Sequence, residues 1–176
     1  LVLEAFVPFD KEISVVLARG ADGEIRAFEP SLNVHRNHIL HTSTVPAGIS
    51  GALAVEATAA ATKIAAALDY VGVLGVEFFV VGETLLVNEI APRVHNSGHW
   101  TEAVCVTDQF EQHIRAILHW PLGDPTRLAP VGMENLVGDE MAGIPIRLGP
   151  GTRPQLYGKS ETRPGRKMGH LNHIDR

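Results

Sequence analysis

Two apolar runs, residues 73–81 and 84–90, lie on either side of Gly82 and Glu83. Runs of this length that are rich in Val, Phe and Leu, and that flank a glycine-containing turn, are typical of a β-hairpin. A hairpin brings separated positions together, because side chains alternate between the two faces of a sheet. The hairpin therefore decides which residues of the two runs can meet, and it is the strongest constraint on how this chain folds.

An acidic residue occurs in each run, and the length of the turn decides whether the two acids meet. A loop with an odd number of residues centred on Glu83 places Glu77 opposite Glu89 on one face. A two-residue turn would instead pair Glu77 with Asn88 and turn Glu89 to the other face. Paired carboxylates repel each other unless a cation lies between them, and Mg²⁺ prefers such hard oxygen ligands. A metal site thus requires the odd loop; the alternative is two unrelated exposed acids.

A polar segment follows the hairpin and contains Arg93, His95, Asn96 and His99. The planar fork of arginine matches carboxylate, carbonate and phosphate groups. Histidine can donate, accept or move a proton near neutral pH. Metal-binding carboxylates followed by an anion-binding group are what phosphoryl transfer requires. The segment is therefore predicted to gather its polar groups around one anionic ligand.

The remaining sequence predicts strands and helices in an α+β fold. Apolar runs predict strands at residues 1–9, 12–19, 24–28, 33–45 and 131–136, and helical spacing predicts helices at 51–69 and 108–119. Ser50 and Asp108 precede the two helices as N-caps. In the second helix, an apolar face is formed by Phe110, Ile114, Ile117 and Leu118.

The stretch W-P-L-G-D-P at residues 120–125 ends the second helix and marks a domain boundary. We predict a first domain over residues 1–122, an antiparallel sheet covered by helices. A small β-rich C-terminal domain is predicted over residues 123–176. The chain lacks an initiator Met, and both ends read as interrupted strands, so we expect a piece of a longer protein with a truncated second domain.

Charge and composition argue against several classes of protein. The net charge is −5, of which residues 153–176 contribute +4 and the rest −9, so overall charge does not favour nucleic-acid binding. A single cysteine, Cys105, excludes a disulfide within the chain and agrees with a reducing cytoplasm. No signal peptide opens the chain and no apolar run is long enough to span a bilayer. We expect a cytoplasmic protein that binds small molecules and no membrane.

Two further features have simple structural interpretations. His35, His38 and His41 suggest zinc, but on one extended strand His38 points away from the other two. No cysteine pair or H-E-x-x-H motif supports such a site. Cys105 is interpreted as a small buried residue rather than a nucleophile.

Several motifs together resemble one branch of the ATP-grasp ligases. The segment E-F-F-V-V-G-E-T-L-L-V-N-E-I-A-P-R is similar to the metal-binding hairpin that closes the ATP-grasp active site. H-N-S-G-H-W, T-D-Q-F-E-Q-H and Y-G-K-S-E-T-R-P-G-R-K-M-G-H narrow the resemblance to the 5-(carboxyamino)imidazole ribonucleotide synthases. It extends from Glu4 to about His170. The resemblance implies the second half of an ATP-grasp domain, ATP and Mg²⁺ as cofactors, and a homodimeric parent protein.

The resemblance also implies a reaction of de novo purine biosynthesis. ATP phosphorylates bicarbonate to carboxyphosphate, and the exocyclic amine of aminoimidazole ribonucleotide is then carboxylated, directly or through released CO₂. The products are 5-(carboxyamino)imidazole ribonucleotide, ADP and phosphate. The family's N-terminal domain, glycine-rich loop and phosphate-binding lysine have no counterpart in this chain, so the chain alone is expected to be inactive.

The resemblance assigns nucleotide-binding roles near the start of the chain. The strand whose backbone holds adenine corresponds to Glu4, Ala5, Phe6 and Val7. Glu12 corresponds to the acid that holds the ribose hydroxyls, and His35 to a histidine of the nucleotide site.

Metal and anion roles follow along the hairpin and the segment after it. Glu77 and Glu89 correspond to the Mg²⁺ ligands, with Asn88 beside them at the nucleotide. The group around bicarbonate and carboxyphosphate corresponds to Arg93, His95 and Asn96. Ala91 stands where many ATP-grasp enzymes have a further metal-binding asparagine, so the two glutamates, phosphates and water are expected to complete the coordination.

The basic segment near the C-terminus has two interpretations. On residues alone, 159–167 is a solvated basic loop. The resemblance instead implies that Lys159, with Arg166 and Lys167, closes over bicarbonate and the ribonucleotide phosphate, with Lys159 in a catalytic role. Pro164 and Gly165 set a turn amid these charges, which favours the closing loop.

Two alternative functions stay open at this point. A sibling ATP-grasp enzyme, of the formate-dependent glycinamide ribonucleotide transformylase or biotin carboxylase type, would share the metal hairpin but lack H-N-S-G-H-W and the basic C-terminal motif. A non-catalytic ATP-grasp remnant would serve as a dimerisation or binding module. An upstream glycine-rich loop and phosphate-binding lysine would distinguish an enzyme from this remnant.

Overall fold

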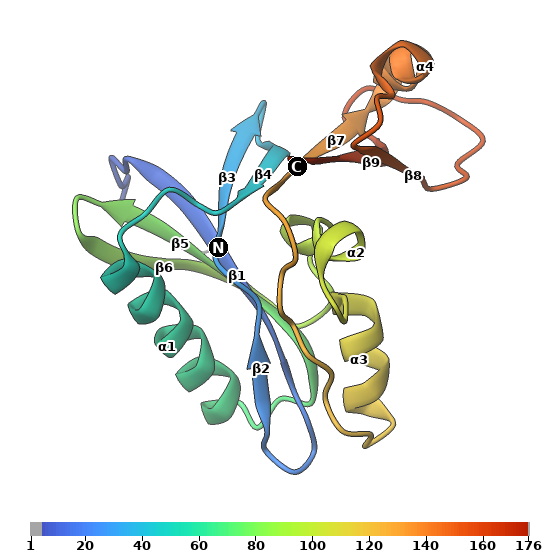
Figure 1. The fold of residues 1–176 in the computed structure, drawn as a ribbon. Coiled ribbons are helices and arrows are strands. Elements are labelled where there is room, and N and C mark those ends of the chain that lie inside the picture. Colours follow the sequence, from blue (N-terminus) through green and yellow to red (C-terminus); the bar gives the residue numbers. More distant parts are fainter. Residues whose placement is uncertain (1–4, 176) are drawn as a thin grey trace.

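The computed structural model describes residues 5–175, and its strands form one sheet. The strands are β1 (Lys11–Arg19), β2 (Ile25–Ala27), β3 (Ser31–Arg36), β4 (Ile39–Val45), β5 (Gly72–Val81), β6 (Thr84–Ala91), β7 (Val131–Val137), β8 (Thr152–Leu156) and β9 (Lys167–Ile174). Their order is β6-β5-β1-β3-β4-β7-β9-β8, with β2 paired to β1, and every pairing is antiparallel (Figure 1). The α+β prediction is confirmed.

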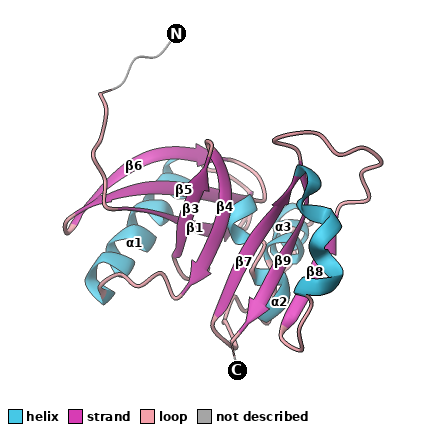
Figure 2. Cartoon of the chain, turned by 90° about the horizontal axis from the view of Figure 1, so that it is seen from above, coloured by secondary structure: helices cyan, strands magenta, loops and turns pink. Residues whose placement is uncertain are grey.

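Helices cover both faces of the first part of this sheet (Figures 1 and 2). The helices are α1 (Gly51–Ala67), α2 (Thr101–Val104), α3 (Gln109–Ile117) and α4 (Ile144–Arg147), with 3-10 turns η1 (Asn96–Gly98) and η2 (Gly138–Gly143). On β1, Ile13 and Leu17 belong to the core that α1 covers. Val16 and Ala18 point the other way, into the core beneath α2 and α3. Both faces of β1 are therefore buried.

Helix α1 forms where the sequence predicts it. The Ser50 side chain accepts a hydrogen bond from the Leu53 backbone N–H, as an N-cap does. The helix packs through Leu53 and a stripe of small residues at helical spacing: Ala57, Ala61 and Ala65. Small side chains allow the helix to lie close to the sheet, so α1 serves as scaffold.

Helix α3 has its predicted N-cap but turns an unexpected face inward. The Asp108 carboxylate accepts hydrogen bonds from the backbone N–H groups of Phe110 and Glu111. The inward face consists of Gln109, Gln112 and Ala116, whereas Ile114, Ile117 and Leu118 are 46–50% exposed. The helix lies on β1 and β5, and its two buried glutamines satisfy the backbone of adjoining loops. Gln112, for example, both donates to and accepts from the backbone of Gly123.

Two strand predictions are wrong. Residues 33–45 do not form one extended stretch, because Asn37 and His38 adopt positive φ angles of 49° and 63° and fold the chain into the β3–β4 hairpin. Asparagine tolerates this conformation better than most residues. Residues 5–9 of the predicted first strand form no strand.

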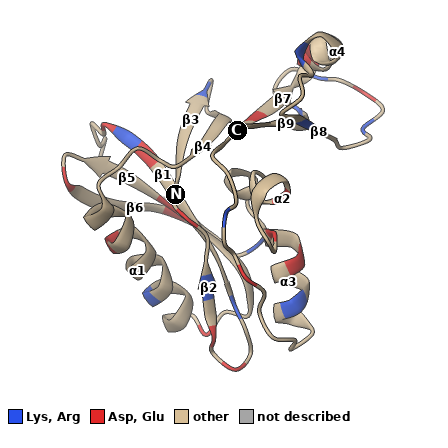
Figure 3. Cartoon of the chain, in the orientation of Figure 1, with Lys and Arg blue, Asp and Glu red and all other residues tan. Residues whose placement is uncertain are grey.

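The C-terminal strands continue the same sheet. Strand β7 pairs with β4, and β9 and β8 follow it outward. The connection between β8 and β9 is a long loop that carries both basic and acidic residues (Figure 3). The proposed boundary at residue 123 falls in the irregular segment before β7 and stays a prediction. Within residues 5–175, no helix combines the length and apolar character needed to cross a bilayer.

Candidate active site

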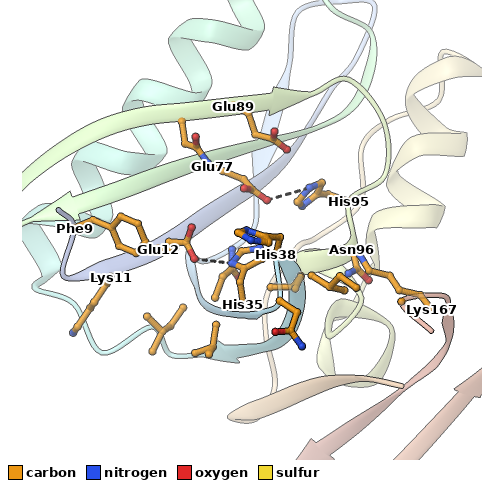
Figure 4. A pocket seen from close by; sticks show the side chains of 18 of the residues that line it. Phe9, Lys11, Glu12, His35, His38, Glu77, Glu89, His95, Asn96 and Lys167 are labelled. Atoms are coloured by element: carbon orange, nitrogen blue, oxygen red, sulfur yellow. Dashed lines mark hydrogen bonds and ion pairs between the residues drawn. The ribbon is translucent and has the colours of Figure 1, made fainter. Parts of the chain in front are cut away.

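A cavity of about 1450 Å³ opens over the face of the sheet that does not carry α1. Its walls come from β1, β3, β5 and β6, from the segment after β6, and from the start of β9 (Figure 4). Side-chain alternation explains why polar residues meet there. Glu12 on β1, His35 on β3 and Glu77 on β5 occupy positions that face away from α1.

A β-bulge brings the two glutamates together, and the predicted odd loop is wrong. The β5–β6 turn has two residues, Gly82 and Glu83, because Val81 pairs directly with Thr84. The register then shifts beside Phe78: this residue pairs with Val87, yet Glu77 pairs with Glu89. Asn88 is the extra residue on β6. A bulge inserts one residue and so reverses the alternation beyond it, which returns Glu89 to the face of Glu77.

The paired carboxylates form a candidate metal site with His95. One ligand atom from each of Glu77, Glu89 and His95 lies within 4.8 Å of the other two. Burial, followed by the neighbouring Glu89 charge, raises the pKa of Glu77. A divalent cation would relieve both effects, and the hard carboxylate oxygens fit Mg²⁺. Within residues 5–175, Glu77, Glu89 and His95 are the group of potential metal ligands that lie close together. The three histidines at 35, 38 and 41 do not form such a group.

His95 is buried at the inner end of the cavity (Figure 4). Its Nε2 lies 3.4 Å from Glu77 Oε1, and its Nδ1 lies 2.7 Å from the Ser97 hydroxyl. Burial, with a smaller contribution from Arg93, lowers the pKa of His95 to about 4. The imidazole is therefore neutral at neutral pH.

Gly75 leaves the space that His95 occupies. A Cβ atom at position 75 would lie 2.8 Å from Cγ of His95. Gly75→Ala is therefore expected to displace the imidazole from Glu77, with a stability loss of about 1–3 kcal/mol for overpacking. Urea unfolding measures the loss. Gly132→Ala is the control, because a Cβ there meets no atom within 4 Å; equal losses in the two variants would contradict the close packing.

Gln109 holds the backbone of the segment that carries His95. Its Oε1 accepts from the His95 N–H at 2.8 Å, and its Nε2 donates to the His95 carbonyl at 2.8 Å. The same Nε2 lies 3.0 Å from Nδ1 of His99. His99 stacks on His170, with ring centroids 4.8 Å apart, and burial lowers the pKa of His99 to about 3. Gln109 was not among the predicted site residues, and a lone glutamine after a helix N-cap is no signal for such a role.

Only some of the residues predicted to bind the nucleotide line the cavity. Glu12 Oε2 and His35 Nδ1 are 2.6 Å apart at the cavity wall. Phe6 lines the cavity with an 89% exposed side chain, whereas Ala5 and Val7 do not line it. Glu4 lies outside the described residues. An adenine-holding strand is therefore not formed over residues 5–7, and their nucleotide role stays a prediction.

The residues predicted to bind the anion face the cavity. Arg93, Asn96 and Lys167 line it together with Asn88. Both polar atoms of the Asn96 side chain are buried and have no hydrogen-bond partner in the described part of the chain. Burial, followed by the Arg93 charge, lowers the pKa of Lys167. These groups have unused capacity to bind an anion.

The other two basic residues do not reach the cavity. Lys159 donates to the Lys167 carbonyl at 2.5 Å, and Arg166 donates to the Glu161 carbonyl at 3.1 Å. Neither residue lines the cavity, although Gly165 in the same loop does. Their substrate-binding roles stay predictions. Burial raises the pKa of Cys105 to about 12, which agrees with an unreactive thiol.

Two family comparisons match most of the chain. Residues 1–110 match the ATP-grasp domain family. Residues 132–176 match the phosphoribosylaminoimidazole carboxylase C-terminal domain family.

Individual relatives agree with these matches. The chain is 54% identical over 175 residues to N5-carboxyaminoimidazole ribonucleotide synthase from Brucella melitensis, covering 98% of this chain and 48% of the relative. A solved N5-carboxyaminoimidazole ribonucleotide synthetase from Thermus thermophilus is similar with a TM-score of 0.91 and 47% identity, covering 98% of this chain and 48% of that one. The Aspergillus clavatus synthase, solved with ADP and 5-aminoimidazole ribonucleotide, has a TM-score of 0.90 and 31% identity at 97% and 48% coverage. The chain thus spans about half the length of these relatives.

Proposed function

Because this chain belongs to the ATP-grasp family, we propose that it supplies the metal- and anion-binding half of a ligase active site. The proposed reaction uses ATP and bicarbonate to carboxylate aminoimidazole ribonucleotide, with carboxyphosphate as intermediate, and gives 5-(carboxyamino)imidazole ribonucleotide, ADP and phosphate. It is a step of purine biosynthesis. The N5-carboxyaminoimidazole ribonucleotide synthases that resemble this chain are about twice as long. The proposed activity therefore belongs to the longer protein.

One observation carries the proposal: a carboxylate pair, half-buried Glu77 and exposed Glu89, lines the same cavity as an anion-binding group. Glu77 and Glu89 face each other across the hairpin, and Arg93, Asn96 and Lys167 lie at the cavity wall. Mg²⁺ bound between the carboxylates would neutralise charge on the ATP phosphates. The chain's own residues would then hold the acceptor: the Arg93 fork matches bicarbonate, and the free amide of Asn96 can both donate and accept.

The remaining residues would position the nucleotide and exclude water. Glu12, fixed by His35 at 2.6 Å, is proposed to hold the ribose hydroxyls. Asn88, which the bulge turns into the cavity, is proposed to contact the nucleotide phosphates. Carboxyphosphate hydrolyses readily in water, so a closed cavity would protect it. Lys159 and Arg166 could contribute only after the loop between β8 and β9 turns inward.

The test measures ADP release by the full-length protein that contains this chain, with Mg²⁺, bicarbonate and aminoimidazole ribonucleotide. We expect release that depends on the ribonucleotide. Release that depends on glycinamide ribonucleotide with formate, or on biotin, would instead identify a sibling ATP-grasp enzyme. No turnover and no nucleotide binding by a folded protein would leave the non-catalytic remnant.

We also infer that the full-length protein acts in the cytoplasm as a homodimer. A single free cysteine agrees with a reducing compartment. The exposed apolar residues of α3 and the segment after it, such as Trp120 at 59%, are available for contact with other protein surface.

A further inference from the structure

A hydrogen-bonded series of buried polar side chains reaches Nδ1 of His95, the ring nitrogen that does not face Glu77. It consists of Ser14 on β1, Ser31 and Asn33 on β3, Ser43 on β4, and Ser97 in η1, each at most 4% exposed. These residues are buried, and buried polar atoms need hydrogen-bond partners. Their hydrogen bonds connect the centre of the sheet to one nitrogen of the His95 ring.

Asn33 joins three of these serine hydroxyls at the inner end of the hydrogen-bonded series. Its Oδ1 accepts from the hydroxyls of Ser43 at 2.8 Å and Ser31 at 3.2 Å. Its Nδ2 donates to Ser14 Oγ at 3.0 Å. Because Ser14 Oγ accepts from this amide, its own proton stays available for another acceptor.

The direction continues through the two serines next to His95. The Ser14 hydroxyl has one proton and two neighbouring oxygens, and it donates to Ser97 Oγ at 2.6 Å rather than to Ser31 Oγ at 3.0 Å. Ser97 Oγ therefore accepts from Ser14, and its own proton is left for Nδ1 of His95 at 2.7 Å. A nitrogen that accepts a hydrogen bond carries no proton.

The opposite side of the ring is consistent with this direction. Nε2 of His95 lies 3.4 Å from a carboxylate oxygen of Glu77 (Figure 4). A proton on Nε2 makes this contact attractive. If the hydrogen bonds ran in the opposite direction, Nδ1 would carry the proton. The unprotonated Nε2 would then present its lone pair to the Glu77 carboxylate, which is unfavourable at a buried position.

We propose that Ser97, oriented by Ser14 and Asn33, is a positioning residue that holds His95 in the tautomer with its proton on Nε2. His95 then faces the cavity as a hydrogen-bond donor. A protonated Nε2 has no lone pair for a metal ion, so the metal ligands of the cluster are the two carboxylates. This inference rests on the proposed function only for the identity of the anion that His95 meets.

The test is an NMR measurement of the ring nitrogens of His95 near pH 7, with the protein labelled with ¹⁵N at histidine only. Each tautomer gives its own pattern of two-bond couplings between ring nitrogens and carbon-bound protons. The His95 signals are those that disappear in His95→Gln. We expect the pattern of a proton on Nε2. A proton on Nδ1 in the unaltered protein would overturn the proposal.

Serine variants then test whether the Ser97 hydroxyl sets the tautomer of His95. Ser97→Ala removes the donor to Nδ1 and is expected to lower the ratio of Nε2–H to Nδ1–H about fivefold, the effect of one typical hydrogen bond. Ser14→Ala keeps the Ser97 hydroxyl but removes the hydrogen bond that orients it, so a smaller decrease in the same ratio is expected. This variant also tests the proposal if Ser97→Ala fails to fold. Ser160→Ala, at an exposed serine, is the control. An unchanged ratio in folded Ser97→Ala would overturn the role of the hydroxyl chain. The readout needs no turnover, so it can fail or succeed independently of the proposed reaction.

Discussion

Glu77→Gln is expected to lower the rate of ADP release by the full-length protein roughly 100- to 1000-fold, a typical loss for a group that stabilises transition-state charge. The variant keeps the shape of the side chain and removes the charge that holds the proposed cation. Steady-state ADP release at saturating Mg²⁺ and substrates measures the effect. The matched control is Glu83→Gln, which removes an exposed acid from the turn of the same hairpin. Near-normal turnover in Glu77→Gln would contradict the metal assignment.

Thermal unfolding separates a metal role from a general structural one. Burial and the Glu89 charge raise the pKa of Glu77, so its ionised form is disfavoured when no cation is present. Glu77→Gln should therefore unfold at the same or a higher temperature than the unaltered protein in metal-free buffer. Added Mg²⁺ should stabilise the unaltered protein, because a ligand that binds only the folded state does so. It should not stabilise the variant; a variant that unfolds earlier in metal-free buffer would indicate a structural role.

Gln109→Leu is expected to reduce the free energy of unfolding by at least about 3 kcal/mol, because it leaves three buried groups without partners at about 1–3 kcal/mol each. These groups are the N–H and carbonyl of His95 and the Nδ1 of His99. Leucine fills a similar volume, so the loss reports hydrogen bonding rather than a cavity. Urea unfolding of the purified protein measures it.

The control for this second prediction is Gln155→Leu, at an exposed position on β8. A surface substitution of this kind should change stability by no more than about 0.5 kcal/mol. A loss below about 1 kcal/mol in Gln109→Leu would show that water or neighbouring groups replace the amide. The bonds to the His95 backbone would then not determine the position of the segment.

The hairpin illustrates how far sequence reasoning reached at the site. Apolar runs and a glycine turn predicted both strands, and the family resemblance paired Glu77 with Glu89. The pairing forms, but through a bulge at Asn88 and not through an odd loop. Bulges insert a residue without changing composition or periodicity enough to be read from a single sequence. The local register was therefore decided by the folded sheet.

Helix α3 shows that the sequence can predict where a helix begins without predicting which face is buried. Its N-cap at Asp108 was predicted correctly, since capping depends on neighbouring residues only. Its apolar residues predicted nothing about its buried face, which carries Gln109 and Gln112 instead. Which face is buried depends on what surrounds the helix, and here the strands β1 and β5 are accompanied by loop backbone at His95 and Gly123 that requires hydrogen bonds.

Local sequence patterns were enough to predict the class of fold, most strands and both long helices, because alternation, helical spacing and capping depend on neighbouring residues. It also carried motifs that resemble one ligase family. The tertiary structure alone decided the β3–β4 turn, the bulge that aligns the carboxylates, and the serine chain behind His95. Ser14 and Ser97 are 83 residues apart. Contacts over such separations depend on how sheet, helices and loops pack together, and no local pattern encodes that packing.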